Sequence, residues 1–494
     1  MNGRKGLACS AAVIVVFVLL AGVANALAIT GPKPRPRNST HKAKVVANTT
    51  GTNTVWCVPN VNVYPSCTNA TTFTHIEDAV EAASDGDVVM VGPGRYNESV
   101  DVETCNLSIF GAQAGRDART RDGFSETIVD ASGKPYTGKG TAYGAVFYNN
   151  CSNDVIDGFT IQGGTSGAAA AGIYSYEGYT VQFTDNIIQN NAIGIYLYES
   201  EEGILVQHNL IRKNNQGTVG SDELKDFQFA GPGVGVVVDE SGNGLVITDN
   251  AFQGNHAAAV FLEDCWEGVQ VTHNTSNGDG ALAVLYSAAV GIEVSNNQGW
   301  NFAAHALPLT GTTYANAAIE VGYYGYGVSI NDNVLGGGAA PNYSGIDFTA
   351  ALGADYTYDP YEDVYFYDPV CYYCQVSNNR ITGFTGYGIV AELMTATGSP
   401  VYQYGQPATL QYSAITNNQI QGNGAGGILI QDAAGNGANS LVNNDLWDNR
   451  PFDCEDETLG SSTMIFGTAG TANTWFKDAG ESSSPNGLCG KRRY

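Results

Sequence analysis

Tyrosine and glutamate recur at matching positions in two copies of one short motif. Gly172 to Glu177 reads GIYSYE, and Gly194 to Glu199 reads GIYLYE 22 residues later. The alternating pattern predicts β-strands whose tyrosines point away from the core. If the two copies lie in neighbouring repeats, the tyrosines of one copy stack on those of the other, about 4.8 Å apart. The predicted substrate-binding residues are therefore Tyr174, Tyr176, Tyr196 and Tyr198.

Carboxylates accompany these tyrosines in the same frame. Aromatic faces beside acids suit a sugar, because its apolar ring faces stack and its hydroxyls donate to the carboxylates. Two carboxylates at a suitable separation can also hydrolyse a glycosidic bond. The candidate catalytic acids are Glu177, Glu199, Glu240 and Asp264, and the strip is thickened by Glu201, Glu202, Asp239 and Glu263. In the alternative interpretation, tyrosine is simply a common strand residue and the acids keep the sheet soluble.

A second candidate site is the segment from Asp355 to Cys374, which reads DYTYDPYEDVYFYDPVCYYC. Long loops on a rigid scaffold often carry function. Hard oxygen ligands suit calcium, although the spacing does not match the EF-hand pattern. The candidate calcium ligands are Asp355, Asp359, Glu362, Asp363 and Asp368, and no other cofactor is indicated.

The rest of the chain repeats an alternating apolar run that ends in asparagine. Successive asparagines are separated by 23, 24 or 26 residues where the interval is short, and by 36 to 46 where a loop is inserted. Such a period predicts stacked repeats. Asparagine tolerates the left-handed turn conformation, and stacked amides can form a ladder. The anchors are Asn186, Asn209, Asn250, Asn274, Asn297, Asn333, Asn379, Asn418 and Asn444.

This unit, followed by Gly-Ile-x-Leu as at Asn186 to Leu197, resembles the right-handed parallel β-helix proteins of the pectin-lyase-like superfamily, in particular their carbohydrate-binding and sugar-hydrolase repeats. The resemblance covers about Phe73 to Cys489 and implies an all-β, single-domain solenoid. It does not imply one activity, because the superfamily includes lyases, hydrolases, epimerases and adhesins. The Asn-Thr-Asp, Gly-His-Gly and Arg-x-Lys signatures of the galacturonan hydrolases do not occur in this sequence.

The charge is strongly acidic and unevenly distributed. The formal net charge is −26, with seven basic residues and no acid in residues 1–44. Residues 45–490 hold 12 Lys and Arg against 48 Asp and Glu, and no Lys or Arg lies between Lys225 and Arg380. This balance argues against a nucleic-acid partner.

The predicted organisation is a signal peptide over residues 1–28, a basic Pro/Thr-rich linker over 29–54, and an N-terminal cap with the first strands over 55–105. Coils with inserted loops follow over 106–450, and a C-terminal cap over 451–494. The alternative for the N-terminus is an uncleaved membrane anchor. A short helix with Ile76, Ala79, Val80 and Ala83 on one face is expected to cover the first coil.

Cysteine usage follows from the predicted signal peptide, which makes disulfides the default. The expected pairs are Cys57–Cys67, Cys105–Cys151 and Cys454–Cys489. Cys371 and Cys374 form a C-x-x-C motif without partners for zinc. A local disulfide, or pairing with Cys265, is the expectation there.

Three functions remain open from the sequence. The first is a secreted or cell-surface protein, monomeric and without a membrane partner after cleavage, that engages extracellular polysaccharide through the tyrosine and acidic strip. The second is a polysaccharide hydrolase or lyase. The third is a structural surface rod with no sugar ligand.

Overall fold

The structure is a computed structural model that describes residues 54–59, 67, 72–121, 125–133, 135–137, 143–219, 232–265, 268–286, 289–302, 316–322, 325–338, 340–351, 371–394, 410–432, 436–460 and 467–491. The chain divides into two units, Met1–Val45 and Val46–Tyr494. All the elements described below lie in the second unit.

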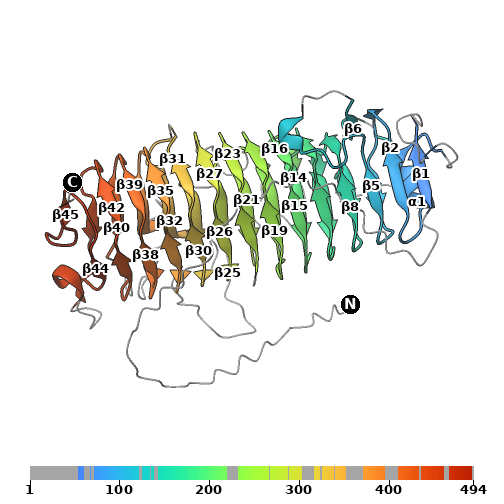
Figure 1. Cartoon of the computed structure of the whole chain (residues 1–494). Coiled ribbons are helices and arrows are strands. Elements are labelled where there is room, and N and C mark those ends of the chain that lie inside the picture. The colour runs from blue at the N-terminus through green and yellow to red at the C-terminus, as the bar shows by residue number, and fades with distance from the viewer. Residues whose placement is uncertain are drawn as a thin grey trace, which may run out of the picture. The chain divides into compact units, whose positions relative to one another are not determined.

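The second unit winds through three long parallel sheets of 14, 13 and 12 strands (Figure 1). One turn of the winding runs from β11 to β12 (Gln182–Thr184), β13 (Ile187–Gln189) and then β14, and each of these strands joins a different sheet from the one before. The 13-stranded sheet consists of β4 (Val100–Val102), β7 (Phe147–Asn149), β11 (Ala171–Tyr176), β14 (Ile193–Tyr198), β18 (Val234–Asp239), β21 (Ala258–Glu263), β24 (Ala283–Tyr286), β28 (Ala317–Gly322), β32 (Ser344–Ala351), β36 (Tyr387–Met394), β40 (Gly426–Ile430), β43 (Cys454–Asp456) and β45 (Ser483–Ser484).

The 14-stranded sheet runs from β1 (Val55–Val58) and β2 (Val88–Val91) to β41 (Ser440–Val442) and β44 (Thr474–Phe476). The 12-stranded sheet runs from β3 (Gly94–Tyr96) to β42 (Asp445–Trp447). Buried aliphatic and aromatic side chains from all three sheets form one continuous core. The predicted all-β solenoid of stacked coils is confirmed.

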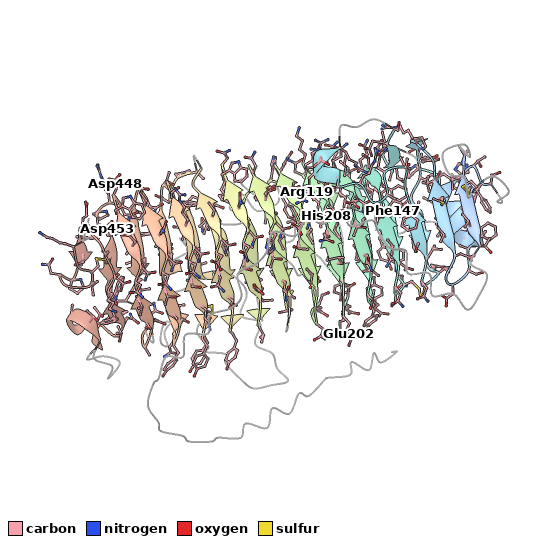
Figure 2. All side chains as sticks on the ribbon, viewed as in Figure 1. Arg119, Phe147, Glu202, His208, Asp448 and Asp453 are labelled. Atoms are coloured by element: carbon pink, nitrogen blue, oxygen red, sulfur yellow. A yellow bond between two sulfur atoms is a disulfide. The ribbon has the colours of Figure 1, made fainter. Side chains whose placement is uncertain are left out.

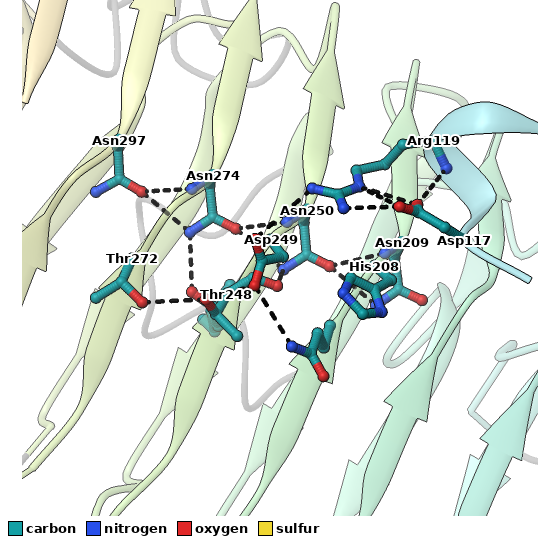
Figure 3. A network of polar contacts seen from close by, with 12 residues as sticks. Asp117, Arg119, His208, Asn209, Thr248, Asp249, Asn250, Thr272, Asn274 and Asn297 are labelled. Atoms are coloured by element: carbon teal, nitrogen blue, oxygen red, sulfur yellow. Dashed lines mark hydrogen bonds and ion pairs between the residues drawn. The ribbon is translucent and has the colours of Figure 1, made fainter. Parts of the chain in front are cut away.

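The anchoring asparagines form the predicted ladder (Figure 3). Asn209 donates its backbone N–H to Oδ1 of Asn250 at 3.0 Å, and Asn250 donates to Asn274 at 2.9 Å in the same way. The Nδ2 group of Asn250 also donates to the Asn274 Oδ1 at 3.1 Å. Because buried amides must be paired, each asparagine fixes the register between two coils.

The expectation that these asparagines adopt the left-handed conformation is wrong. The residue before each anchor does so instead, for example His208 at φ 58° and His273 at φ 56°. This arrangement leaves the anchoring side chain inside the coil, where it reaches the next amide. His208 and His273 are therefore turn residues.

Helix α1 (Ile76–Ala82) lies at the N-terminal end of the coils and buries Ile76, Ala79 and Val80, as predicted. Its N-cap residue, His75, makes no side-chain cap hydrogen bond. Glu98 supplies the acceptor from another part of the chain, since Oε2 receives the N–H of Ile76 at 2.7 Å and of Glu77 at 3.1 Å.

Three predicted disulfides are confirmed: Cys57–Cys67, Cys105–Cys151 and Cys454–Cys489. Of the alternatives for the C-x-x-C motif, the structure has the local pair Cys371–Cys374, and Cys265 is a buried free thiol. Within residues 451–494, β43, β44 and β45 continue the sheets of the coils, and the Cys454–Cys489 pair fastens this end.

Candidate functional site

The outer face of the 13-stranded sheet carries the predicted tyrosines in the predicted register. Tyr174 pairs with Tyr196 and Tyr176 with Tyr198 across β11 and β14. The ring centroids of Tyr174 and Tyr196 are 5.1 Å apart, and those of Tyr176 and Tyr198 are 5.6 Å apart with the rings inclined by 15°. The stacking inferred from the repeated motif is confirmed.

The expected exposure is wrong for half of this set. Tyr174 and Tyr196 are only 4% and 2% exposed, and they belong to a second apolar cluster outside the main core. Tyr148 stacks on Tyr174 at 5.6 Å, and Phe261 lies farther along in the same cluster. Aromatic side chains in successive coils shield one another, so Tyr174 and Tyr196 support the face instead of contacting a ligand.

In the coils that follow the half-exposed Tyr176 and Tyr198, two acids occupy the same position on the sheet. In consecutive coils the register aligns Tyr198 with Asp239, Asp239 with Glu263, and Glu263 with Tyr286. We call this line of side chains the tyrosine–acid row; it consists of Tyr176, Tyr198, Asp239, Glu263 and Tyr286. From the sequence, Asp239 and Glu263 only thickened the strip, and Tyr286 was not predicted because its coil lacks the motif.

Asp239 and Glu263 are buried, at 1% and 7% exposure, although within the described residues neither acid forms an ion pair with a basic side chain. Burial, opposed by a hydrogen bond from Tyr196 and reinforced by nearby acids, raises the pKa of Asp239 to about 7. Burial and the neighbouring Asp239 raise the pKa of Glu263 to about 9. Glu263 is therefore protonated at neutral pH, while Asp239 titrates near it.

Tyr196 links the buried cluster to this pair, because its hydroxyl donates to Oδ2 of Asp239 at 2.8 Å. Oδ1 of Asp239 and Oε2 of Glu263 are buried without a hydrogen-bond partner. A protonated acid beside a carboxyl group of lower pKa is an arrangement that can exchange protons with a bound substrate.

The four acids that the motif singled out lie one residue farther along, where the strands end. All four have left-handed backbones: Glu177 (φ 51°), Glu199 (φ 46°), Glu240 (φ 44°) and Asp264 (φ 44°). Glu177 is exposed, and the other three are half-buried. They form a rim beside the tyrosine–acid row, and Glu202 lies farther along this edge, away from Arg119 and His208 (Figure 2).

A second group of acids on the same sheet was not anticipated. Glu320 on β28 pairs in register with Asp347 on β32, and Glu392 on β36 lies in the next coil. Asp347 is fully buried, and neither of its carboxylate oxygens has a hydrogen-bond partner. Burial, with Glu392 and Glu320 nearby, raises its pKa well above the usual range. Only alignment of the strands across the inserted loops could have revealed this group.

The candidate calcium ligands Asp355, Asp359, Glu362, Asp363 and Asp368 lie outside the described residues. Within the described part of the chain, no group of three or more His, Cys, Asp or Glu side chains could hold a metal ion. The same part contains no helix that is long and apolar enough to cross a membrane. The predicted signal peptide also falls on residues that the structure does not describe.

Comparison with known families gives one match. Residues 125–223 match the family described as "Right handed beta helix region". No curated protein sequence matches the chain.

Solved structures with a similar fold act on polysaccharides. The catalytic unit of the α-1,3-glucanase from Streptomyces thermodiastaticus aligns with a TM-score of 0.50 and 13% identity, over 82% of this chain and 66% of that one. The A-module of a mannuronan C-5 epimerase from Azotobacter vinelandii aligns with a TM-score of 0.46 and 14% identity, over 81% and 93% of the two chains. An alginate lyase from a Paenibacillus species aligns with a TM-score of 0.37 and 13% identity, over 73% and 96%.

At this identity the α-1,3-glucanase match shows the fold and no activity. Together with the family match and the three parallel sheets, it confirms a right-handed parallel β-helix.

Proposed function

We propose that this parallel β-helix engages an extracellular polysaccharide through the tyrosine–acid row and its carboxylate rim. The observation that carries the proposal is the stacked, half-exposed pair Tyr176 and Tyr198, whose rings lie 5.6 Å apart beside the carboxylates of Glu177 and Glu199. Tyrosine offers an apolar face to a sugar ring and a hydroxyl for hydrogen bonding. The neighbouring carboxylates accept hydrogen bonds from sugar hydroxyls.

The electrostatics favour a neutral or weakly charged chain as the ligand. Acids outnumber basic residues fourfold in residues 45–490, so a polyuronate would be repelled unless cations bridged it. The four disulfides fit a secreted or cell-surface location, because disulfides persist in oxidising compartments.

The test is binding of the protein to a panel of soluble neutral glycans and alginate, measured by affinity electrophoresis. Replacing both Tyr176 and Tyr198 by alanine is expected to weaken binding about tenfold, since each lost aromatic contact removes roughly 0.5–1.5 kcal/mol. Tyr179→Ala is the matched control, because Tyr179 is an exposed tyrosine outside the row. Equal binding by the double variant and the control would refute the proposal.

A second candidate function, hydrolysis of a polysaccharide, is favoured by one observation. Asp239 and Glu263 lie in register on adjacent strands, and their pKa values are raised to about 7 and about 9. Adjacent strands are about 4.8 Å apart, which is close to the carboxylate separation of roughly 5 Å in retaining glycosidases. In that chemistry Glu263 would donate a proton to the leaving oxygen while Asp239 attacks the anomeric carbon, and water activated by Glu263 would then cleave the glycosyl–Asp239 ester. Because Asp239 is only 1% exposed, a bound glycan would first have to uncover its carboxylate.

The two candidates differ in one measurable product. If the protein is a hydrolase, new reducing ends appear with the parent protein and disappear with Glu263→Gln, which keeps the shape but cannot donate the proton. If it is only a binder, no reducing ends appear with the parent protein or with Glu263→Gln. Glu457→Gln, which changes an exposed glutamate far from the row and its rim, serves as the control for both assays.

A further inference from the structure

A second group of tyrosines lies on a small sheet beside the long ones. Four strands form this sheet: β25 (Ala289–Val290), β29 (Gly325–Tyr326), β33 (Cys371–Tyr372) and β37 (Leu410–Gln411). Its first strand follows directly after β24, the last strand of the tyrosine–acid row, and lies along the lower edge in Figure 1. We call the group formed by Tyr326, Tyr372, Tyr373 and Tyr412 the tyrosine array.

The rings of the array contact one another and remain open to solvent. Tyr326 lies 6.1 Å from Tyr372 with the rings inclined by only 14°, and Tyr373 lies 5.7 Å from both Tyr326 and Tyr412. Tyr326, Tyr373 and Tyr412 are 43%, 48% and 45% exposed, among the most exposed large apolar side chains of the described residues. A contiguous exposed aromatic surface of this kind marks an interaction site.

Two of these tyrosines occupy a backbone position that suits glycine. After each short strand the chain turns through a left-handed residue: Gly291 (φ 62°), Gly327 (φ 64°), Tyr373 (φ 56°) and Tyr412 (φ 49°). The backbone N–H of each of the four donates to a carbonyl of the next coil in the same way. A bulky side chain is unfavourable in that conformation. Two coils have glycine at this position and the next two have tyrosine. Because tyrosine is the less favourable residue there, we infer that the two rings serve a purpose other than folding.

Part of the array is also held rigid. The disulfide Cys371–Cys374 brackets Tyr372 and Tyr373, so little freedom is lost when a ligand binds. Burial and the neighbouring tyrosines raise the pKa of Tyr372 to about 12, so its hydroxyl stays protonated at neutral pH and can donate a hydrogen bond.

We propose that the tyrosine array is a second carbohydrate-binding platform, which stacks on the ring faces of a neutral pyranose chain. Tyr326 and Tyr372 lie nearly parallel in adjacent coils, and Tyr373 stands edge-on to both, so the array presents ring faces in two orientations. Pyranose rings offer apolar C–H faces of similar size. The acidic balance of residues 45–490 disfavours an anionic chain and fits a neutral one. This inference shares its ligand class with the proposed function, but it rests on different residues and a different sheet.

The test uses the glycines of the neighbouring coils as a guide. The double variant Tyr373→Gly/Tyr412→Gly gives these turns the residue found at Gly291 and Gly327, so its thermal midpoint should stay within a few degrees of the parent's. Its affinity for soluble glucan, xylan or mannan should fall at least about fivefold, and Tyr179→Ala should bind as the parent does. Unchanged affinity in the double variant would overturn the inference.

Protection from tyrosine nitration, mapped by mass spectrometry with and without each glycan, separates this inference from the proposed function. Protection of Tyr326, Tyr373 and Tyr412 supports the platform. Protection of Tyr176 and Tyr198 alone overturns it and leaves the proposed function standing, and protection at neither group overturns both. If the parent sediments as a dimer that the double variant dissociates, the array binds a second copy of the chain, which also overturns the inference.

Discussion

Asp239 and Glu263 show how one residue of displacement changes the chemistry of a site. The acids Glu240 and Asp264 that follow them lie on a left-handed turn at the rim, whereas Asp239 and Glu263 end their strands and are buried. Burial disfavours the charged form, so both buried acids hold protons at a pH where free carboxyl groups have lost them. Because these two acids bind protons more tightly in the folded protein, the stability of the fold depends on pH.

The first prediction concerns this coupling. The pKa of Glu263 rises from 4.5 to about 9 and that of Asp239 from 3.8 to about 7 on folding. The stability that the protonated acids contribute is present in full below pH 4 and is lost as the pH rises toward 7 and 9. We expect the free energy of unfolding to fall by a few kcal/mol between pH 5 and 9, since one pKa unit corresponds to about 1.4 kcal/mol.

Chemical denaturation across this pH range measures the effect. Glu263→Gln should flatten the decline above pH 7, because glutamine does not titrate, while Glu177→Gln on the exposed rim should follow the parent curve. A Glu263→Gln curve parallel to the parent's would contradict the assignment.

The second prediction concerns Asn250, one of the asparagines of the ladder. Asn250 bonds both to its neighbour Asn274 and to the carbonyl of Val206. Asn250→Ala leaves several buried groups unpaired, and each costs about 1–3 kcal/mol. The free energy of unfolding, measured in urea, should fall by at least about 3 kcal/mol. Gln298→Ala removes an exposed amide and is the control; it should lower the free energy of unfolding by less than about 0.5 kcal/mol.

At the scale of the element, helix α1 depends on a residue outside itself. The Glu98 carboxylate accepts hydrogen bonds from the backbone N–H groups of Ile76 and Glu77, and Glu98 is only 2% exposed. A carboxylate at a helix N-terminus satisfies unpaired donors and interacts favourably with the helix dipole. Glu98 is therefore one of the contacts that fasten the helix to the first coil, together with the hydrogen bond that the Asp101 N–H donates to Glu77 at 2.7 Å.

The third prediction follows from this contact. Glu98→Ala should destabilise the N-terminal end by about 1–2 kcal/mol, as loss of a helix cap does. Hydrogen exchange should show faster exchange in α1 and β2, while the amides of β40 keep their protection. Glu457→Ala, which removes an exposed carboxylate near the other end, is the control and should leave α1 unchanged.

At the scale of the whole molecule, the coils carry a large negative charge with few compensating ion pairs. Residues 45–490 hold 48 acids and 12 basic residues, and the ion pairs of the described coils are concentrated around Arg95, Arg119 and Arg121. Like charges repel across the fold, and dissolved salt screens them within about 10 Å at 0.1 M.

The fourth prediction is that salt stabilises the protein. Raising NaCl from 10 mM to 0.5 M at pH 7.5 should increase the thermal midpoint by several degrees, because screening weakens the repulsion. At pH 4 many carboxylates are neutral, so the same change should have little effect. An equal increase at both pH values would point to a general salt effect and refute the electrostatic explanation.

The architecture could be predicted from the order of the amino acids. The strand alternation and the repeated asparagines are local signals, and each copy repeats the same evidence, so the coils, the ladder, the capping helix and three disulfides could be predicted. The stacking of Tyr174 on Tyr196 was also predictable, because those two coils are separated by a short, uninterrupted interval.

Only the tertiary structure decided which side chains are available to a ligand. The Tyr196 hydroxyl donates a hydrogen bond to Asp239, which is 43 residues away in the sequence. The ring of Tyr372 contacts that of Tyr412, which lies beyond an inserted loop. Burial and pKa depend on the neighbours in adjacent coils, and inserted loops of unequal length hide those neighbours from any fixed period. The repeat therefore specifies the scaffold, whereas the register between coils specifies the site.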